Sequence, residues 1–174
     1  MCIRDRSGED LIKKAVEWTR KCAFKKYSID IFRDHSEIVD IEKRLHRFRA
    51  CDENGLRSLA KDCVKITIER LNKKALLQVL GLEKSNLGTL KLLERVLSSV
   101  TSEDFARSHM APLYGAYDLR GADAHLSSSD IEGSYSRVMV NRDMPLFIQG
   151  EMLIKNVADT IGFIGTAIIK SKKD

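Results

Sequence analysis

Residues 111–130 hold the side chains best suited to chemistry. An arginine, a histidine, three aspartates and two tyrosines lie close together there. An imidazole can take up and release a proton near neutral pH. A guanidinium offers two parallel N–H groups to the oxygens of a phosphate. Arg120 and His125 are therefore the leading candidates, for proton transfer beside a bound anion.

The elements around these residues restrict how the two side chains can meet. Leu113, Ala116, Tyr117 and Arg120 recur at steps of three and four residues, which predicts a helix. Arg120 and His125 are five residues apart, so on a continuous helix they would point about 140° away from each other. A shared site requires the helix to end or distort near Gly121, or requires a second protomer.

The spacing of Arg120 and His125, with four residues between them, resembles the signature of HEPN domains. The resemblance covers about residues 85–174: a helical hairpin, the motif at a helix end, and a final long helix. It implies a metal-independent ribonuclease without a cofactor, acting as a homodimer in which both motifs face each other. His125 would be the general acid or base near the RNA 2′-hydroxyl, and Arg120 would stabilise charge on the phosphate.

Three neighbours of this motif are expected to support it: Tyr117, Asp118 and Asp123. The chain departs from the family pattern at one place, because Gly121 follows the arginine where active members often carry a polar residue. The resemblance implies a bacterial effector of the kind found in toxin–antitoxin and antiphage systems.

Other uses of the same residues remain open. Asp118 and His125, with Asp123 or His109, have the side-chain types that ligate divalent ions, although no established metal-binding spacing is present. Asp118 and Arg120 also suit polar contacts between helices. The alternative function is a non-catalytic helical interaction or dimerisation domain at the C-terminus of a larger protein.

A second candidate region is the basic cluster of Lys43, Arg44, Arg47 and Arg49. It reads either as a surface for the RNA backbone or as a solvated helix end that carries favourable cations. The net charge of the sequence is +5, which permits an RNA partner without requiring one.

The composition predicts an all-α fold. Only two of the 174 residues are proline, and leucine, isoleucine, lysine and glutamate are abundant. Apolar residues recur with a helical period along most of the chain. We expect a bundle of about six or seven helices, with an N-terminal helical region over residues 7–80 packed on the HEPN-like unit of residues 85–174. Around Val138 to Val140 the pattern hints at a strand.

Residues 1–6 (MCIRDR) resemble a translated sequencing adapter, so we expect the native chain to continue upstream of Ser7. Three cysteines remain, at 22, 51 and 63. Their spacing favours buried, reduced thiols over a disulfide framework. The longest apolar run, residues 161–169, is about half of a membrane span. We therefore expect a cytoplasmic protein that does not contact a membrane, with RNA, a second copy and the upstream part of its own chain as partners.

Overall fold

The computed structural model describes residues 8–121 and 127–171. The prediction of an all-α fold is confirmed: 73% of the chain is helical, and nine α-helices lie in the described part, more than the six or seven expected. The only β pairing among these residues is an isolated bridge between Phe32 and Leu71. The suggested strand near Val138 is wrong, because Val138 ends a helix and Met139 follows in the left-handed region (φ 60°).

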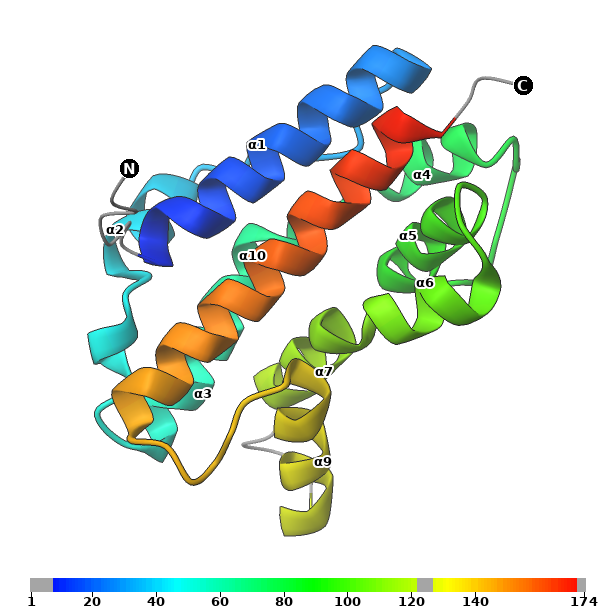
Figure 1. Cartoon of the computed structure of the whole chain (residues 1–174). Helices are drawn as coiled ribbons and strands as arrows, with labels where there is room; N and C mark the ends of the chain where they lie inside the picture. The colour runs from blue at the N-terminus through cyan, green and yellow to red at the C-terminus, as the bar shows by residue number, and fades with distance from the viewer. Residues whose placement is uncertain (1–7, 122–126, 172–174) are drawn as a thin grey trace, which may run out of the picture.

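Two parallel helices, α1 (Gly8–Tyr27) and α10 (Leu146–Lys170), form one layer of the bundle (Figure 1). The Thr19 hydroxyl donates a hydrogen bond to the Ile161 carbonyl (2.6 Å). Close approach depends on Gly165, where a Cβ would lie 2.7 Å from Thr19 Cα. The small residue thus lets α1 lie directly against α10.

The helix α10 is central to the fold, and it packs against α1, α3 and α7. By length and composition, this helix could cross a membrane. Its longest apolar run, residues 161–169, is only about half of a membrane span. In the structure 56% of its most apolar window is buried, a pattern shared with the core helices of bundles.

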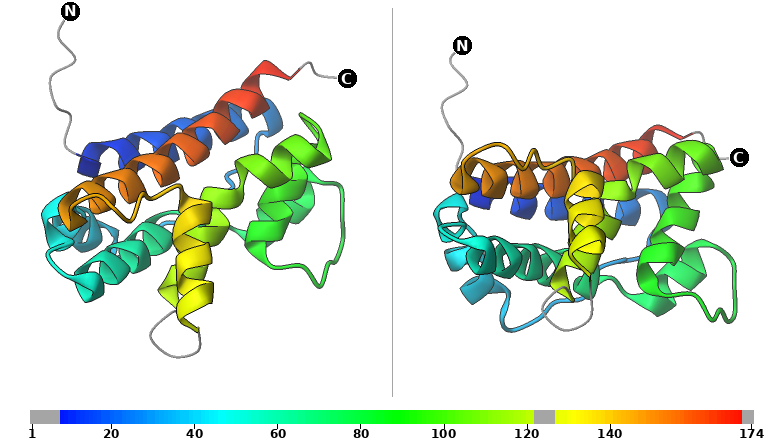
Figure 2. Two further views of the ribbon diagram at one scale, coloured as in Figure 1. Left: turned by 60° about the horizontal axis from the view of Figure 1, so that its bottom comes forward. Right: turned by 90° about the horizontal axis from the view of Figure 1, so that it is seen from below.

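The chain between α1 and residue 80 forms short helices beneath this layer (Figure 2). They are α2 (Ile38–Arg44), the 3-10 helix η1 (Arg47–Arg49), α3 (Glu53–Ile66), the 3-10 helix η2 (Ile68–Arg70) and α4 (Lys73–Val79). The carboxylate of Asp52 caps α3 by accepting from the Gly55 N–H (2.6 Å), and Asn72 caps α4. Ile38, Ile41, Leu45 and Phe48 lie at helical spacing after Ser36, a residue type that favours the N-cap position, and this pattern predicts one helix from Ser36 past Phe48. It ends at Arg44 instead, and Phe48 is 65% exposed.

The remaining helices lead to the motif region. They are α5 (Thr89–Ser98), α6 (Glu103–His109), α7 (Ala111–Arg120) and α9 (Ser128–Val138). Leu90, Leu93 and Val96 lie at helical spacing along α5, and all three are buried. Ser127 and Asp130 form a capping box at the start of α9. One hydrophobic core runs through both predicted regions, because buried residues of α1 and α3 join those of α5, α7 and α10.

Candidate functional site

The hairpin of α7 and α9 positions Arg120. Pro112 lies in the first turn of α7, where its missing N–H costs no hydrogen bond. The helices approach closely at Gly115, where a Cβ would lie 2.5 Å from the Ser134 carbonyl oxygen and 2.7 Å from a Val138 methyl group. The helix α7 ends at Arg120, with Gly121 as its C-cap. A shared site required either a helix end near Gly121 or a second protomer, and α7 does end there.

Arg120 contacts side chains from two elements. Its guanidinium forms an ion pair with the Glu69 carboxylate from η2. It also lies over the ring of Tyr117, 4.7 Å from the centroid. The side chains of Arg120 and Glu69 are each 38% exposed. Arg120 is therefore oriented by its neighbours while its guanidinium stays accessible to solvent.

The residues predicted to support Arg120 have different roles. Asp118 pairs with Arg137 of α9 (3.0 Å), an inter-helix contact that ties the hairpin together. Tyr117 is 40% exposed and forms one side of the Arg120 contact. Asp123 and His125 lie outside the described residues. The structure thus groups Arg120 with Tyr117 and Glu69, and assigns Asp118 to a contact within the hairpin.

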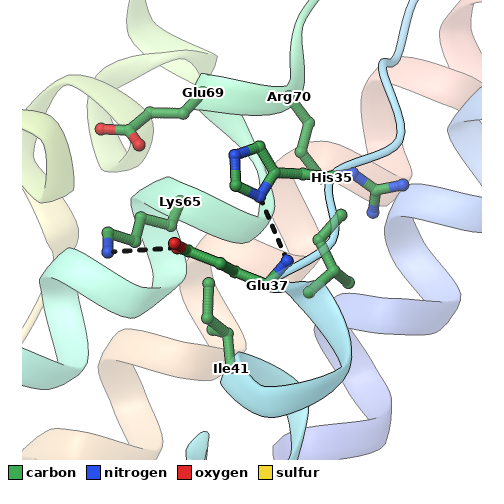
Figure 3. A pocket seen from close by; sticks show the side chains of 7 residues that line it. His35, Glu37, Ile41, Lys65, Glu69 and Arg70 are labelled. Carbon is green, nitrogen blue, oxygen red and sulfur yellow. Dashed lines mark hydrogen bonds and ion pairs between the residues drawn. The ribbon is translucent and has the colours of Figure 1, made fainter.

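Glu69, the partner of Arg120, also lines a small cavity of about 60 Å³ (Figure 3). His35, Glu37, Lys65 and Arg70 line it as well. The Glu37 N–H donates to Nδ1 of His35 (3.2 Å), and Lys65 pairs with Glu37 (3.8 Å). A volume of this size holds a few water molecules and is too small for a nucleotide. The sequence pointed to none of these residues, since about 30 positions separate His35 from Lys65.

The basic cluster of residues 43–49 is neutralised by carboxylates of the same chain. Arg44 binds Asp62 through two hydrogen bonds (2.8 and 3.0 Å), and Arg49 pairs with the same carboxylate. The Asp62 side chain is only 6% exposed, and its hydrogen bonds raise the pKa of the Arg44 guanidinium. Arg47 pairs with Glu151 (2.6 Å).

Lys43, the remaining member of the cluster, lies 3.4 Å from the carboxylate of Asp40. The side chains of the cluster also do not share one helix face, because α2 ends at Arg44 and η1 begins at Arg47. Each cation that was predicted to meet RNA therefore has an acidic partner in this structure.

The described residues include no group of three or more His, Cys, Asp or Glu side chains that could hold a metal ion. His109, one candidate ligand, packs against the rings of Phe105 and Phe163, with centroids 5.3 and 4.0 Å away. Burial there lowers the pKa of His109. Asp118 is engaged by Arg137.

The cysteines only partly match the expectation of buried thiols. Cys22 and Cys63 are buried, and burial raises the pKa of both thiols. Cys51 is exposed, contrary to that expectation, because it lies in the link between η1 and α3. All three are free thiols.

Comparisons with known proteins found no matching family model, no similar curated protein and no similar solved structure.

Proposed function

We propose that this protein is an HEPN-like RNA-binding effector that cleaves RNA without a metal ion, acting as a homodimer. The observation that carries the proposal is the placement of Arg120. Its side chain is partly exposed at the end of α7, and the guanidinium lies over the Tyr117 ring. In the sequence, Arg120 directly precedes the segment that contains His125. Such a group suits a phosphate oxygen better than it suits a role in the core.

Glu69 must release Arg120 for a phosphate to bind. Ion pairs between exposed side chains contribute about 0–1 kcal/mol, so replacing this carboxylate with a phosphate costs little. A phosphate also accepts two parallel hydrogen bonds from the guanidinium. Glu69 then serves to orient Arg120 before RNA arrives, and the Tyr117 ring keeps the guanidinium in place afterwards.

The proposed reaction uses the RNA 2′-hydroxyl as the nucleophile. Its oxygen bonds to the adjacent phosphorus, the bond from phosphorus to the 5′-oxygen breaks, and a 2′,3′-cyclic phosphate results. One histidine takes the 2′-hydroxyl proton, and the leaving 5′-oxygen receives a proton from an acid, a role open to the second protomer's copy of His125. Arg120 stabilises the negative charge that develops on the phosphate oxygens.

The test is cleavage of a labelled single-stranded RNA in EDTA by wild-type protein, Arg120→Ala and His125→Ala. We expect cleavage by the wild type and a loss of about 100-fold or more in each variant. An all-deoxy strand of the same sequence should stay intact. Arg95→Ala is the matched control, because Arg95 is exposed on α5 and has no acidic partner among the described residues. Absence of cleavage by folded wild-type protein would refute the ribonuclease proposal.

The second candidate is a non-catalytic interaction or dimerisation domain, and one observation favours it. Phe48 and Phe147 are 65% and 42% exposed and border a cavity of about 430 Å³ together with Cys51 and Leu146. Exposed apolar surface of this kind often marks a protein contact. Sedimentation velocity on F48S/F147S tests it: this candidate predicts a dimer in the wild type and a monomer in the variant, with Arg120→Ala still dimeric.

A further inference from the structure

The solvent side of α1 combines exposed aromatic rings with lysines. Phe24 is 59% exposed, and Lys21 and Lys25 are exposed beside it. Trp18 is 48% exposed and borders this side, with its indole N–H donating to the Thr166 hydroxyl of α10 (3.1 Å). The opposite side of the helix is buried against α10 through residues such as Ile12, Val16 and Ala23. We call Trp18, Lys21, Phe24 and Lys25 the α1 face.

Phe24 borders a cavity of about 300 Å³ between α1 and the segment that follows it. Lys21, Lys25, Arg20 and Asp30 line the rest of this cavity. That volume is at the lower end of the range for small-molecule sites, and it is several times larger than the cavity beside Glu69. A flat ring can therefore lie against Phe24 with cations close by.

The lysines of the α1 face are available to an anion. Within residues 8–121 and 127–171, neither Lys21 nor Lys25 has a hydrogen bond or ion pair from its side chain. The acidic residues nearby are Asp30 and Asp34, which are both bound by Arg20, and the exposed Glu17 one turn before Lys21. Because α1 and α10 are parallel, Lys170 at the end of α10 lies at the same end of the layer as Lys25 (Figure 1).

We infer that the α1 face binds single-stranded RNA, with phosphates at Lys21 and Lys25 and an unpaired base stacked on Phe24. Exposed aromatic rings beside unpaired cations fit a single strand, because its bases are free to stack. This inference rests on the proposed function and adds a second contact for the same substrate. The helix α1 lies on the opposite side of α10 from the α7–α9 hairpin (Figure 1). The α1 face would therefore hold RNA without contacting the cleaved bond.

The experiment measures binding of a labelled single-stranded RNA by fluorescence anisotropy over a range of salt concentrations. In K21A/K25A we expect the slope of log affinity against log salt to fall by about 1.4, since each phosphate contact to a single strand contributes about 0.7. Phe24→Ala should raise the Kd by at least about fivefold, and Phe24→Trp should keep wild-type binding because it retains a stacking ring. A duplex of the same sequence should show no dependence on Phe24.

The matched control is K43A/R47A, which removes two cations that already have acidic partners. We expect its salt slope to match the wild type. Equal losses in K43A/R47A and K21A/K25A, or wild-type binding in both K21A/K25A and Phe24→Ala, would overturn the inference. The inference would also be overturned if the wild-type protein did not bind RNA but bound phosphatidylserine vesicles through Lys21 and Lys25, since that result identifies a membrane surface as the partner.

The same panel separates this inference from the proposed ribonuclease. Binding that depends on the α1 face, with no cleavage in EDTA, supports the inference and refutes the ribonuclease. Cleavage that requires Arg120 and His125, with binding unaffected in K21A/K25A and Phe24→Ala, supports the ribonuclease and refutes the inference about the α1 face. Circular dichroism melts of each variant confirm that the compared proteins are folded.

Discussion

The basic cluster of residues 43–49 and the α1 face contain similar side chains. They differ in whether their cations are paired with carboxylates. Each places cations beside an exposed aromatic ring: Arg47 lies 5.0 Å from the Phe48 centroid, and Lys21 and Lys25 flank Phe24. In the first region every cation has a carboxylate partner. In the α1 face, the lysines have no such partner within the described residues.

The difference shows that density of positive charge is a poor guide to phosphate binding. The cluster is the denser of the two in sequence, but Asp62 and Glu151 neutralise three of its arginines. Arg44 and Arg49 must leave the buried carboxylate of Asp62 before they can contact a phosphate, and that reduces the net gain from binding. For exposed pairs such as Arg47 with Glu151 or Arg120 with Glu69, this loss is at most about 1 kcal/mol. When unpaired lysines neutralise phosphates, the counterions of the RNA are released into solution without that cost.

The largest effect is expected from Asp62→Ala, which removes the buried partner of Arg44 and Arg49. Loss of one member of a buried pair costs about 3–5 kcal/mol. Both arginines are partly exposed and can turn toward water, so we expect a loss of about 2–4 kcal/mol in the free energy of unfolding. Urea unfolding followed by circular dichroism measures this loss.

The same variant should bind RNA with a steeper salt dependence, because it frees two cations. If its affinity and salt slope match those of the wild type, the ion pairs with Asp62 are not what prevents the cluster from binding RNA. Asp62→Asn is the control, since it keeps the shape of the side chain and one hydrogen-bond acceptor.

The next effect is expected from Gly165→Val, which should displace α1 from α10. The added atoms would lie within 3 Å of Thr19, and overpacking of this kind costs about 1–3 kcal/mol. RNA binding by the α1 face should weaken along with stability, as measured by thermal melts and anisotropy. Gly162→Ala is the matched control, because its Cβ meets Ala15 at an ordinary 3.7 Å. Equal destabilisation by both would show that the close approach at Gly165 is unimportant.

The smallest effect is expected from Glu151→Gln, which releases Arg47. The pair is 36% and 42% exposed, so the free energy of unfolding should change by less than about 1 kcal/mol. The RNA salt slope should steepen by at most about 0.7, as one cation becomes available. Glu83→Gln removes the same charge from a residue without a cationic partner in the described part of the chain, and should leave the slope unchanged. Equal changes in both variants would indicate a general charge effect and weaken the comparison.

The fold was largely predictable from local pattern, and the site was not. Apolar residues at helical spacing indicate α1, α5 and α10, because the buried side of a helix needs an apolar residue at every third or fourth position. The break after Arg44 was missed because Phe48 continues the apolar pattern although its side chain is exposed.

Availability of a cation depends on contacts that sequence spacing does not reveal. Glu151 is 104 residues from Arg47, and Glu69 is 51 residues from Arg120. The spacing of Arg120 and His125 left open whether a helix ends near Gly121, and the structure ends α7 at Arg120. The contact with Glu69 had no local signal, since it forms only when η2 and α7 pack together.

The parallel pairing of α1 with α10 has a consequence for synthesis of the chain. Thr19 bonds to a carbonyl 142 residues later, so α1 cannot complete its main contact until α10 has been translated. At about 5–20 residues per second, roughly 7–28 s separate the two on a ribosome. During that interval the apolar stripe of α1 lacks its main partner, because α2 and α3 cover only a small part of it, and docking of α10 is therefore a late step in folding.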